Sequence, residues 1–190
     1  ITTHPADETV CENEGASFSV EANGDGIIYQ WQVSNDGGTT YTDISGETGT
    51  TLTLSAATLA QHQNKYRAVV SNCSSNTTIS NAATLIVNAN PVVTISLLPN
   101  ASSPASIEVT GIAPAGTYSY VWYSNNEVIT GQTASSITLA SNPGISGDIK
   151  VVATNSATGC TAISNELVVQ RGKSDVLVVY NNPNNGNFEV

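Results

Sequence analysis

Short runs of alternating apolar and polar residues, separated by turn-forming residues, recur along the whole chain. Residues 18–20 alternate, and residues 29–33 place a tyrosine, a tryptophan and a valine on one side and two glutamines on the other. A period of two residues is typical of a β-strand with one buried face. Turn signals such as Asn23-Gly24 and Asn142-Pro143-Gly144 lie between the runs. The pattern predicts an all-β protein in which only residues 56–61 have a weak helical character.

The order of these segments occurs twice. Tyr29-Gln30-Trp31 matches Tyr120-Val121-Trp122 at an offset of 91 residues (120 − 29). Further matches, in the same order, join 67–72 with 150–155 and 79–81 with 163–165. Two copies of one fold explain such a repeat, and a chain of 190 residues is long enough for both to bury a core. We therefore predict domains at 1–89 and 90–172, a linker at 88–91 and a separate C-terminal segment at 173–190.

Each copy fits an immunoglobulin-like β-sandwich. In the first, Trp31 follows Val20 by 11 positions (31 − 20), the spacing between the strand-B cysteine and the core tryptophan of such domains. Val20 and Ala68 fill the two cysteine positions, and Tyr66 is the candidate for the tyrosine corner. In the second copy the core tryptophan is Trp122. There an isoleucine replaces the tyrosine, so we expect no tyrosine corner.

The charge of the chain excludes some partners. Fifteen acidic and five basic residues give a net charge of −10, which repels nucleic acid and anionic membranes. No run approaches the ~20 apolar residues of a transmembrane helix. The first ten residues have neither the basic nor the apolar region of a signal peptide, so we expect a mature or excised fragment. The mixture of Ser, Thr, Asn and Gly with few charges resembles that of secreted bacterial surface proteins.

One short motif raises the question of enzymatic activity. Ser34-x-Asp36-x-Gly38-x-Thr40-Tyr41 resembles the Asp-box of sialidases and other β-propeller glycoside hydrolases. In propellers the motif recurs in several blades, whereas it occurs once here. We therefore interpret it as a hairpin turn, in which Asp36 bonds the amides of its own turn, two glycines supply positive φ and the tyrosine packs back.

Other candidate chemistry is weaker. The closest acidic pairs, Asp7/Glu8 and Glu12/Glu14, have no accompanying apolar pocket signal, although glycosidases need two carboxylates held across one bond. Nucleophile elbows and phosphate loops are absent, and His62 precedes Tyr66 where a polar corner residue is ordinary. We predict no enzyme activity and no cofactor. A calcium site remains a weak alternative, with these loop carboxylates as its ligands: Asp7, Glu12, Asp25 and Asp36.

The densest aromatic cluster is residues 118–123. Tyr118, Tyr120 and Trp122 alternate onto one face, which we expect to be the core. Tyr123 and Val121 then face outward. An exposed tyrosine beside an aliphatic residue is a weak candidate for sugar or protein binding, although isolated outward aromatics are common on strands.

Several features together define a resemblance. Trp31 followed by SNDGGTTYTDI, then Tyr66-Arg67, Cys73 and ISNAATL, is similar to the tandem Ig-like repeats of large secreted or surface proteins in the Bacteroidetes. The resemblance implies an extracellular location and a Cys11–Cys73 disulfide. The second copy keeps only Cys160, because no cysteine stands near its residues 102–103. The resemblance therefore implies a free thiol at Cys160.

The C-terminal residues VLVVYNNPNNGNFEV resemble the opening of the C-terminal sorting domain of type IX secretion cargo. Asn181 stands where that family usually has its first proline. A hairpin of Leu177–Tyr180 with Phe188–Val190 is expected, and a generic hairpin is the alternative interpretation.

The sequence thus predicts a non-catalytic extracellular module that acts as a spacer or adhesion part of a larger protein. The alternative is a polysaccharide- or protein-binding module appended to a secreted enzyme, with Tyr123 as its candidate contact. The expected partners are other domains of the parent protein, polysaccharide or surface proteins, with no nucleic acid and no membrane insertion.

Overall fold

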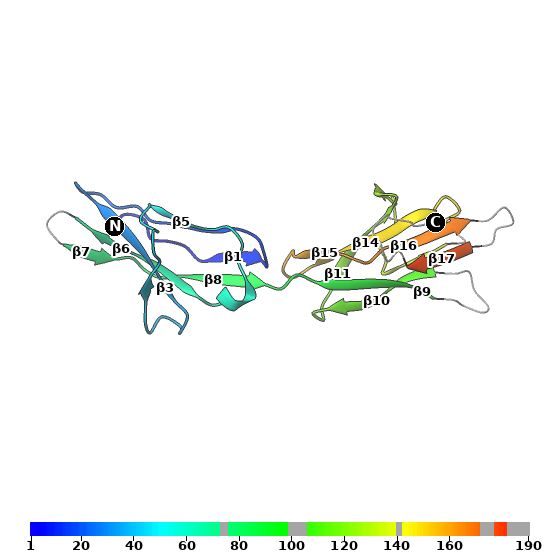
Figure 1. Cartoon of the computed structure of the whole chain (residues 1–190), viewed down its shortest axis with the longest axis horizontal. Helices are drawn as coiled ribbons and strands as arrows, with labels where there is room; N and C mark the ends of the chain where they lie inside the picture. Colours follow the sequence, from blue (N-terminus) through cyan, green and yellow to red (C-terminus); the bar gives the residue numbers. More distant parts are fainter. Residues whose placement is uncertain (73–75, 99–105, 140–141, 172–176, 182–190) are drawn as a thin grey trace. The chain divides into compact units, whose positions relative to one another are not determined.

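The protein is all-β and divides into two compact units, Ile1–Ala89 and Asn90–Val190 (Figure 1). The structure is a computed structural model that describes residues 1–72, 76–98, 106–139, 142–171 and 177–181. Its one helical element among these residues is the 3-10 turn η1 (Leu59–Gln61), within the segment that has weak helical character in the sequence. The first predicted domain matches the first unit in its bounds.

The first unit contains two sheets. The larger has the strand order β1-β8-β6-β3-β4, with β7 also paired to β6, and the smaller pairs β2 with β5. Their bounds are β1 (Glu8–Cys11), β2 (Ala16–Ser19), β3 (Ile28–Ser34), β4 (Thr42–Asp43), β5 (Thr51–Leu54), β6 (Lys65–Ser71), β7 (Thr77–Ile79) and β8 (Ala83–Asn88).

The second unit repeats this arrangement. One sheet has the order β13-β10-β9, and the other has the order β12-β11-β14-β16-β17 with β15 paired to β14. Their bounds are β9 (Val92–Leu98), β10 (Ser106–Ala113), β11 (Tyr118–Ser124), β12 (Glu127–Val128), β13 (Ser136–Thr138), β14 (Gly147–Asn155), β15 (Thr161–Ile163), β16 (Leu167–Arg171) and β17 (Leu177–Asn181).

Both units are immunoglobulin-like β-sandwiches, as the sequence predicts. In each, a small antiparallel sheet, of two strands in the first unit and three in the second, packs over a longer sheet whose central pair carries the core tryptophan. Trp31 pairs with Ala68, and Trp122 pairs with Val151. Both tryptophans are completely buried. Each indole N–H donates to a backbone carbonyl of its own unit, 3.0 Å and 2.8 Å away respectively.

The core of the first unit joins the residues that the spacing analysis selected. Val20, Trp31, Tyr66 and Ala68 belong to one buried cluster. Phe18 stacks on Tyr66 with ring centroids 4.8 Å apart and an interplanar angle of 23°. An offset stack of this kind adds to the area that both rings bury. In the second unit the pattern is aliphatic, because Ile149 replaces the tyrosine within the cluster around Trp122.

The repeated Ile-Ser-Asn motif has the same structural role in both units. Ser80 lies between β7 and β8, and Ser164 lies between β15 and β16. Both serines are buried. Ser80 Oγ accepts from the Ala68 amide at 2.9 Å, and Ser164 Oγ accepts from the Val151 amide at 3.0 Å. Each serine therefore satisfies the amide of the residue paired with the core tryptophan, which would otherwise be buried without a partner.

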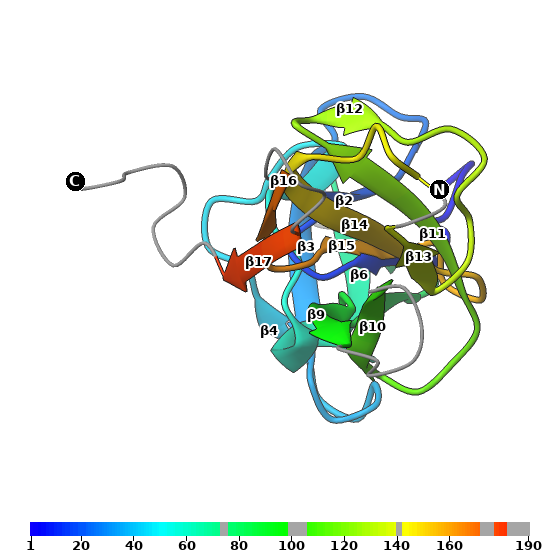
Figure 2. The same cartoon turned by 90° about the vertical axis from the view of Figure 1, so that its right-hand side faces the viewer.

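The C-terminal strand joins the second unit. β17 pairs antiparallel with β16 over five registered positions, from Leu167↔Asn181 to Arg171↔Leu177 (Figures 1 and 2). A separate C-terminal segment at 173–190 therefore does not describe Leu177–Asn181, because its backbone extends the sheet of the second unit. The other half of the predicted hairpin, Phe188–Val190, lies outside the described residues.

Candidate functional site

The Asp-box turn begins at the end of β3 and is held by several side-chain hydrogen bonds. The Asp36 carboxylate accepts the backbone amides of Thr39 at 2.9 Å and Thr40 at 2.9 and 3.0 Å, and also the hydroxyl of Thr40. The Ser34 hydroxyl donates to Asp36 at 2.7 Å and accepts the Gly38 amide at 2.8 Å. This is the bonding that the interpretation as a turn requires.

These hydrogen bonds also determine the electrostatics of Asp36. The hydroxyl and the amide of Thr40, followed by the Ser34 hydroxyl, hold the pKa of the carboxyl well below its usual range. A general acid must keep its proton near neutral pH, and a nucleophile must face its substrate. Asp36 is ionised and directed at its own turn, so its carboxylate holds the turn together. We call this set of hydrogen bonds between Asp36 and its turn the Asp36 staple.

Gly37 and Gly38 both have positive φ, 77° and 97°. A Cβ on Gly38 would lie 3.1 Å from both the Tyr41 hydroxyl and the Lys65 side chain. The tyrosine therefore packs back on the turn. The Arg67 guanidinium lies over the Tyr41 ring, 3.6 Å from the ring centroid, in a cation–π contact. The contact of Arg67 with Tyr41 was not predicted from the sequence, because it depends on strand pairing.

The outer sheet face of the second unit carries the predicted contact Tyr123. Tyr123 is half-buried and lies opposite Lys150 and Val128 on the neighbouring strands. Val121 is 39% exposed and pairs with Val152, which in turn pairs with Ile163, 62% exposed. The outward face is thus an aliphatic row beside a tyrosine, whereas Tyr118 and Tyr120 pack against the core as expected.

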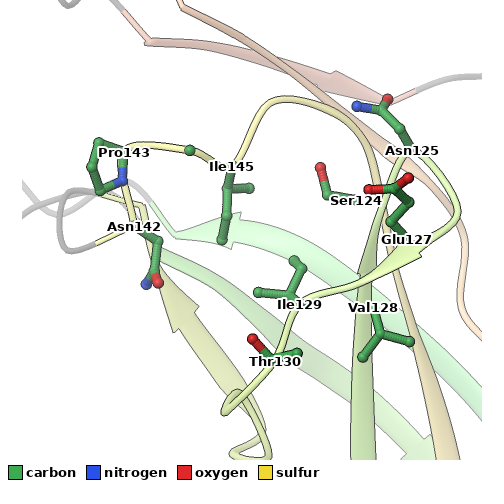
Figure 3. Close-up of a pocket in the computed structure, with 10 residues that line it drawn as sticks. Ser124, Asn125, Glu127, Val128, Ile129, Thr130, Asn142, Pro143 and Ile145 are labelled. Carbon is green, nitrogen blue, oxygen red and sulfur yellow. The ribbon is translucent and has the colours of Figure 1, made fainter.

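A pocket of about 530 Å³ lies in the second unit, between β12 and the segment that follows β13 (Figure 3). Ile129 and Ile145 lie in its middle, with Asn142 on one side and Ser124 and Glu127 on the other (Figure 3). The remaining lining residues are Asn125, Val128, Thr130, Pro143 and Gly144. None of these residues was singled out as a site from the sequence, because the pocket brings together two segments about fifteen residues apart.

The acidic residues that were calcium candidates do not converge. Within the described ranges, no group of three or more His, Cys, Asp or Glu side chains is placed to hold a metal ion. Asp7 accepts the Thr84 amide at 2.6 Å, and Asp36 is engaged in its turn. His62 accepts the Val87 amide through Nδ1 at 3.1 Å, a structural contact at the corner before β6.

Tyr66 is buried at the second position of β6. Burial raises the pKa of its hydroxyl, and side-chain hydrogen bonds with Asn64 and Gln61 oppose that shift. These partners precede the tyrosine by two and five residues, so its hydroxyl is held at the corner that leads into β6.

The cysteines require a correction. Cys160 is buried and disulfide-bonded, so the prediction of a free thiol at this position is wrong. Cys11 is also disulfide-bonded, and Cys73 lies outside the described residues. A Cys11–Cys73 bond would leave Cys160 no cysteine within the chain, so that pairing conflicts with the bonded state of Cys160. The free thiol was expected because the second repeat contains no other cysteine.

None of the described segments forms a helix with the length and apolar character needed to cross a membrane.

Parts of the chain are similar to known proteins. Residues 2–89 match a family model described as a domain of unknown function, DUF8696. Endoglucanase C of Cellulomonas fimi is 36% identical over 95 residues, which is 50% of this chain and 8% of that protein. Solved structures of the N-terminal four Ig domains of Dscam1 are also similar. Isoform 1.9 has 18% identity and a TM-score of 0.41, and isoform 9.44 has 16% and 0.43, each covering 84% of this chain and 42% of the other.

Proposed function

We propose that this chain is a non-catalytic extracellular module that acts as a spacer or adhesion part of a larger secreted or cell-surface protein. The observation that carries the proposal is the state of Asp36. The one residue whose motif suggested glycosidase chemistry has its carboxylate bonded to Ser34, Thr39 and Thr40 of its own turn. A carboxylate used in this way supports a structural role.

The way each unit is built supports the proposed spacing role. Each has its own buried core around one tryptophan, and the two cores are separated in sequence by residues 88–91, which end in a proline. A unit that closes its own core resists extension by itself. Such modules place other domains of the parent protein away from the cell surface or from one another.

We further propose that the parent protein is a Bacteroidetes protein exported by type IX secretion. The support is the resemblance of most of residues 1–88 to Ig-like repeats and of residues 176–190 to the start of a sorting domain. The bonded cysteines favour an oxidising compartment, and hence an extracellular location. The low content of basic residues agrees with a partner set without nucleic acid.

A second candidate function is favoured by one specific observation. The similarity to a segment of an endoglucanase suggests a polysaccharide-binding module of a secreted enzyme. In that case the outward face of Tyr123 and Val121 would contact the polysaccharide, since aromatic rings stack on the apolar faces of sugars. The chain matches only 8% of that enzyme, so the activity of the enzyme does not itself transfer.

Affinity electrophoresis through gels that contain soluble glucans or xylans, together with pull-down on insoluble cellulose, separates the two proposals. The spacer proposal expects unchanged mobility and no retention. Retardation that Tyr123→Ala abolishes, and that the outward-facing control Thr154→Ala leaves intact, would replace it with the polysaccharide-binding proposal. Hydrolysis of any of these polysaccharides by the purified chain would contradict both.

A further inference from the structure

We infer that the pocket between β12 and residues 142–145 of the second unit is a binding site for the side chain of a lysine on a protein partner. This role is additional to spacing and does not depend on it. The inference rests on which polar groups of the pocket are already engaged, on the sign of its charge and on its apolar middle.

The amide side chains at the pocket are engaged within the protein. Asn125 donates to the Ser146 carbonyl at 2.9 Å and accepts the Asp148 amide at 3.1 Å. Asn142 donates to the Thr138 carbonyl at 2.8 Å. The Ser124 hydroxyl also donates to the Ser146 carbonyl, at 2.7 Å. These groups shape the pocket and have few hydrogen-bond donors left for a ligand.

Glu127 differs from these neighbours. Its side chain is exposed, and it takes part in no ion pair or side-chain hydrogen bond with the described part of the chain. It is also the one charged residue among those that line the pocket. A carboxylate accepts hydrogen bonds and cannot donate them when ionised, so the pocket favours a ligand that brings donors and positive charge.

The middle of the pocket defines the rest of the ligand. Ile129 and Ile145 lie between the carboxylate and Asn142 (Figure 3). A lysine buries a four-carbon stem along apolar surface and keeps its ammonium in a polar environment. Such a side chain would lay its stem over the partly exposed Ile129 and Val128, since Ile145 is buried, and place its ammonium at Glu127. The negative charge of the chain, −10 overall, further favours a cationic partner.

Backbone geometry keeps the pocket in shape. Asn125 and Asn126 both have positive φ, 51° and 67°, and form the two-residue turn between β11 and β12. Gly147 has a φ of 86°, and a Cβ there would collide with the Asn125 side chain. The asparagine is therefore locked between the Ser146 carbonyl and the Asp148 amide, which fixes the wall of the pocket next to Glu127.

The test is a titration of the whole ¹⁵N-labelled chain with Nα-acetyl-lysine methylamide, followed by NMR. A single exposed ion pair with a partly buried apolar stem supports a Kd on the order of 10 mM. The expected result is a saturable shift of the amides of Glu127, Thr130 and Ile145. At equal concentration, the uncharged norleucine analogue should give shifts at least about threefold smaller than those caused by the lysine probe. Salt at about 0.5 M should also reduce the lysine-dependent shifts, because it screens exposed charges.

Two matched variants make the result specific. Glu127→Gln should abolish the lysine-dependent shifts, whereas Glu108→Gln removes the same charge from β10 of the same unit and should leave them intact. The inference is overturned if Glu127→Gln responds as the native chain does, or if no amide of the pocket shifts up to about 100 mM probe. Shifts caused by cellobiose but not by lysine would show that the pocket is a sugar site.

Discussion

The two units bury the same kind of core but close their sheets differently. In the first, the strand after β3 follows a long loop stapled by Asp36, whereas in the second the strand after β11 follows the two-residue turn Asn125-Asn126. The outer edge of the last strand differs as well. β8 is covered by the preceding strand β1, which runs parallel to it, and β16 is covered by the following strand β17, which runs antiparallel.

This difference separates the parts of an Ig-like domain that its core requires from those that vary. Both units keep the tryptophan, its indole hydrogen bond to a backbone carbonyl and the buried serine beside it. The covering strand and the hairpin turn lie at the edge, where any backbone with free donors and acceptors can complete the sheet. Edge structure therefore diverges between copies while the centre does not.

The largest effect is expected from removing either core tryptophan. Trp31→Ala and Trp122→Ala should each destabilise their own unit by about 3–5 kcal/mol, because a large buried side chain leaves a cavity and an unpaired carbonyl. Denaturant unfolding measures this, and the tryptophan left in each variant reports on the other unit. An exposed control, Val121→Ala, should stay within about 0.5 kcal/mol. Equal loss in both units would contradict the independence of the two cores.

Replacing either of the two equivalent serines, Ser80 or Ser164, should cause the second largest loss of stability. Ser80→Ala and Ser164→Ala each leave a buried backbone amide without its acceptor, at a cost of about 1–3 kcal/mol in that unit. Urea titration with fluorescence detection compares them with the exposed controls Ser17→Ala and Ser119→Ala. A cost no larger than that of the controls would show that the serine does not satisfy the amide of the residue paired with tryptophan.

The Asp36 staple predicts a pH dependence confined to the first unit. Because the folded pKa of Asp36 is lowered, its contribution to stability is present above the ordinary carboxyl range and is lost as the pH falls below about 4. Melting curves from pH 7 to pH 2 should show this loss for the native chain and a smaller one for Asp36→Asn. Asp25→Asn removes an exposed carboxylate of the same unit and should keep the native pH dependence. An identical acid response of Asp36→Asn and native protein would count against the staple.

The smallest expected effect is the number of cysteine thiols that react with a maleimide. Because Cys11 and Cys160 are bonded, a denatured but unreduced chain should react with one equivalent of a maleimide, and a reduced chain with three. Peptide mapping should find Cys160 unlabelled before reduction. Denaturant is needed because burial alone protects a thiol. Labelling of Cys160 without reductant would restore its prediction as a free thiol.

Much of this molecule follows from local patterns in its sequence. The alternation around Trp31 predicted a strand with the tryptophan face buried. The distance from Val20 to Trp31 predicted that the β-sandwich is of the immunoglobulin-like class. The spacing of the Asp-box residues predicted a turn, since every bond of the Asp36 carboxylate reaches a residue within four positions. Short-range chemistry of this kind is visible in a sequence because the partners are neighbours in it.

Contacts between distant segments were decided by the tertiary structure. The stacking of Arg67 on Tyr41 and the lining of the pocket by Glu127 and Ile145 depend on strand register and loop packing, and no local pattern marks them. The bonded state of Cys160 and the pairing of β17 with β16 belong to the same class. The sequence by itself determined two Ig-like cores and a stapled turn, because periodicity and short spacing encode them. Edge pairing and the pocket were decided only when the chain folded, because they depend on which distant segments meet.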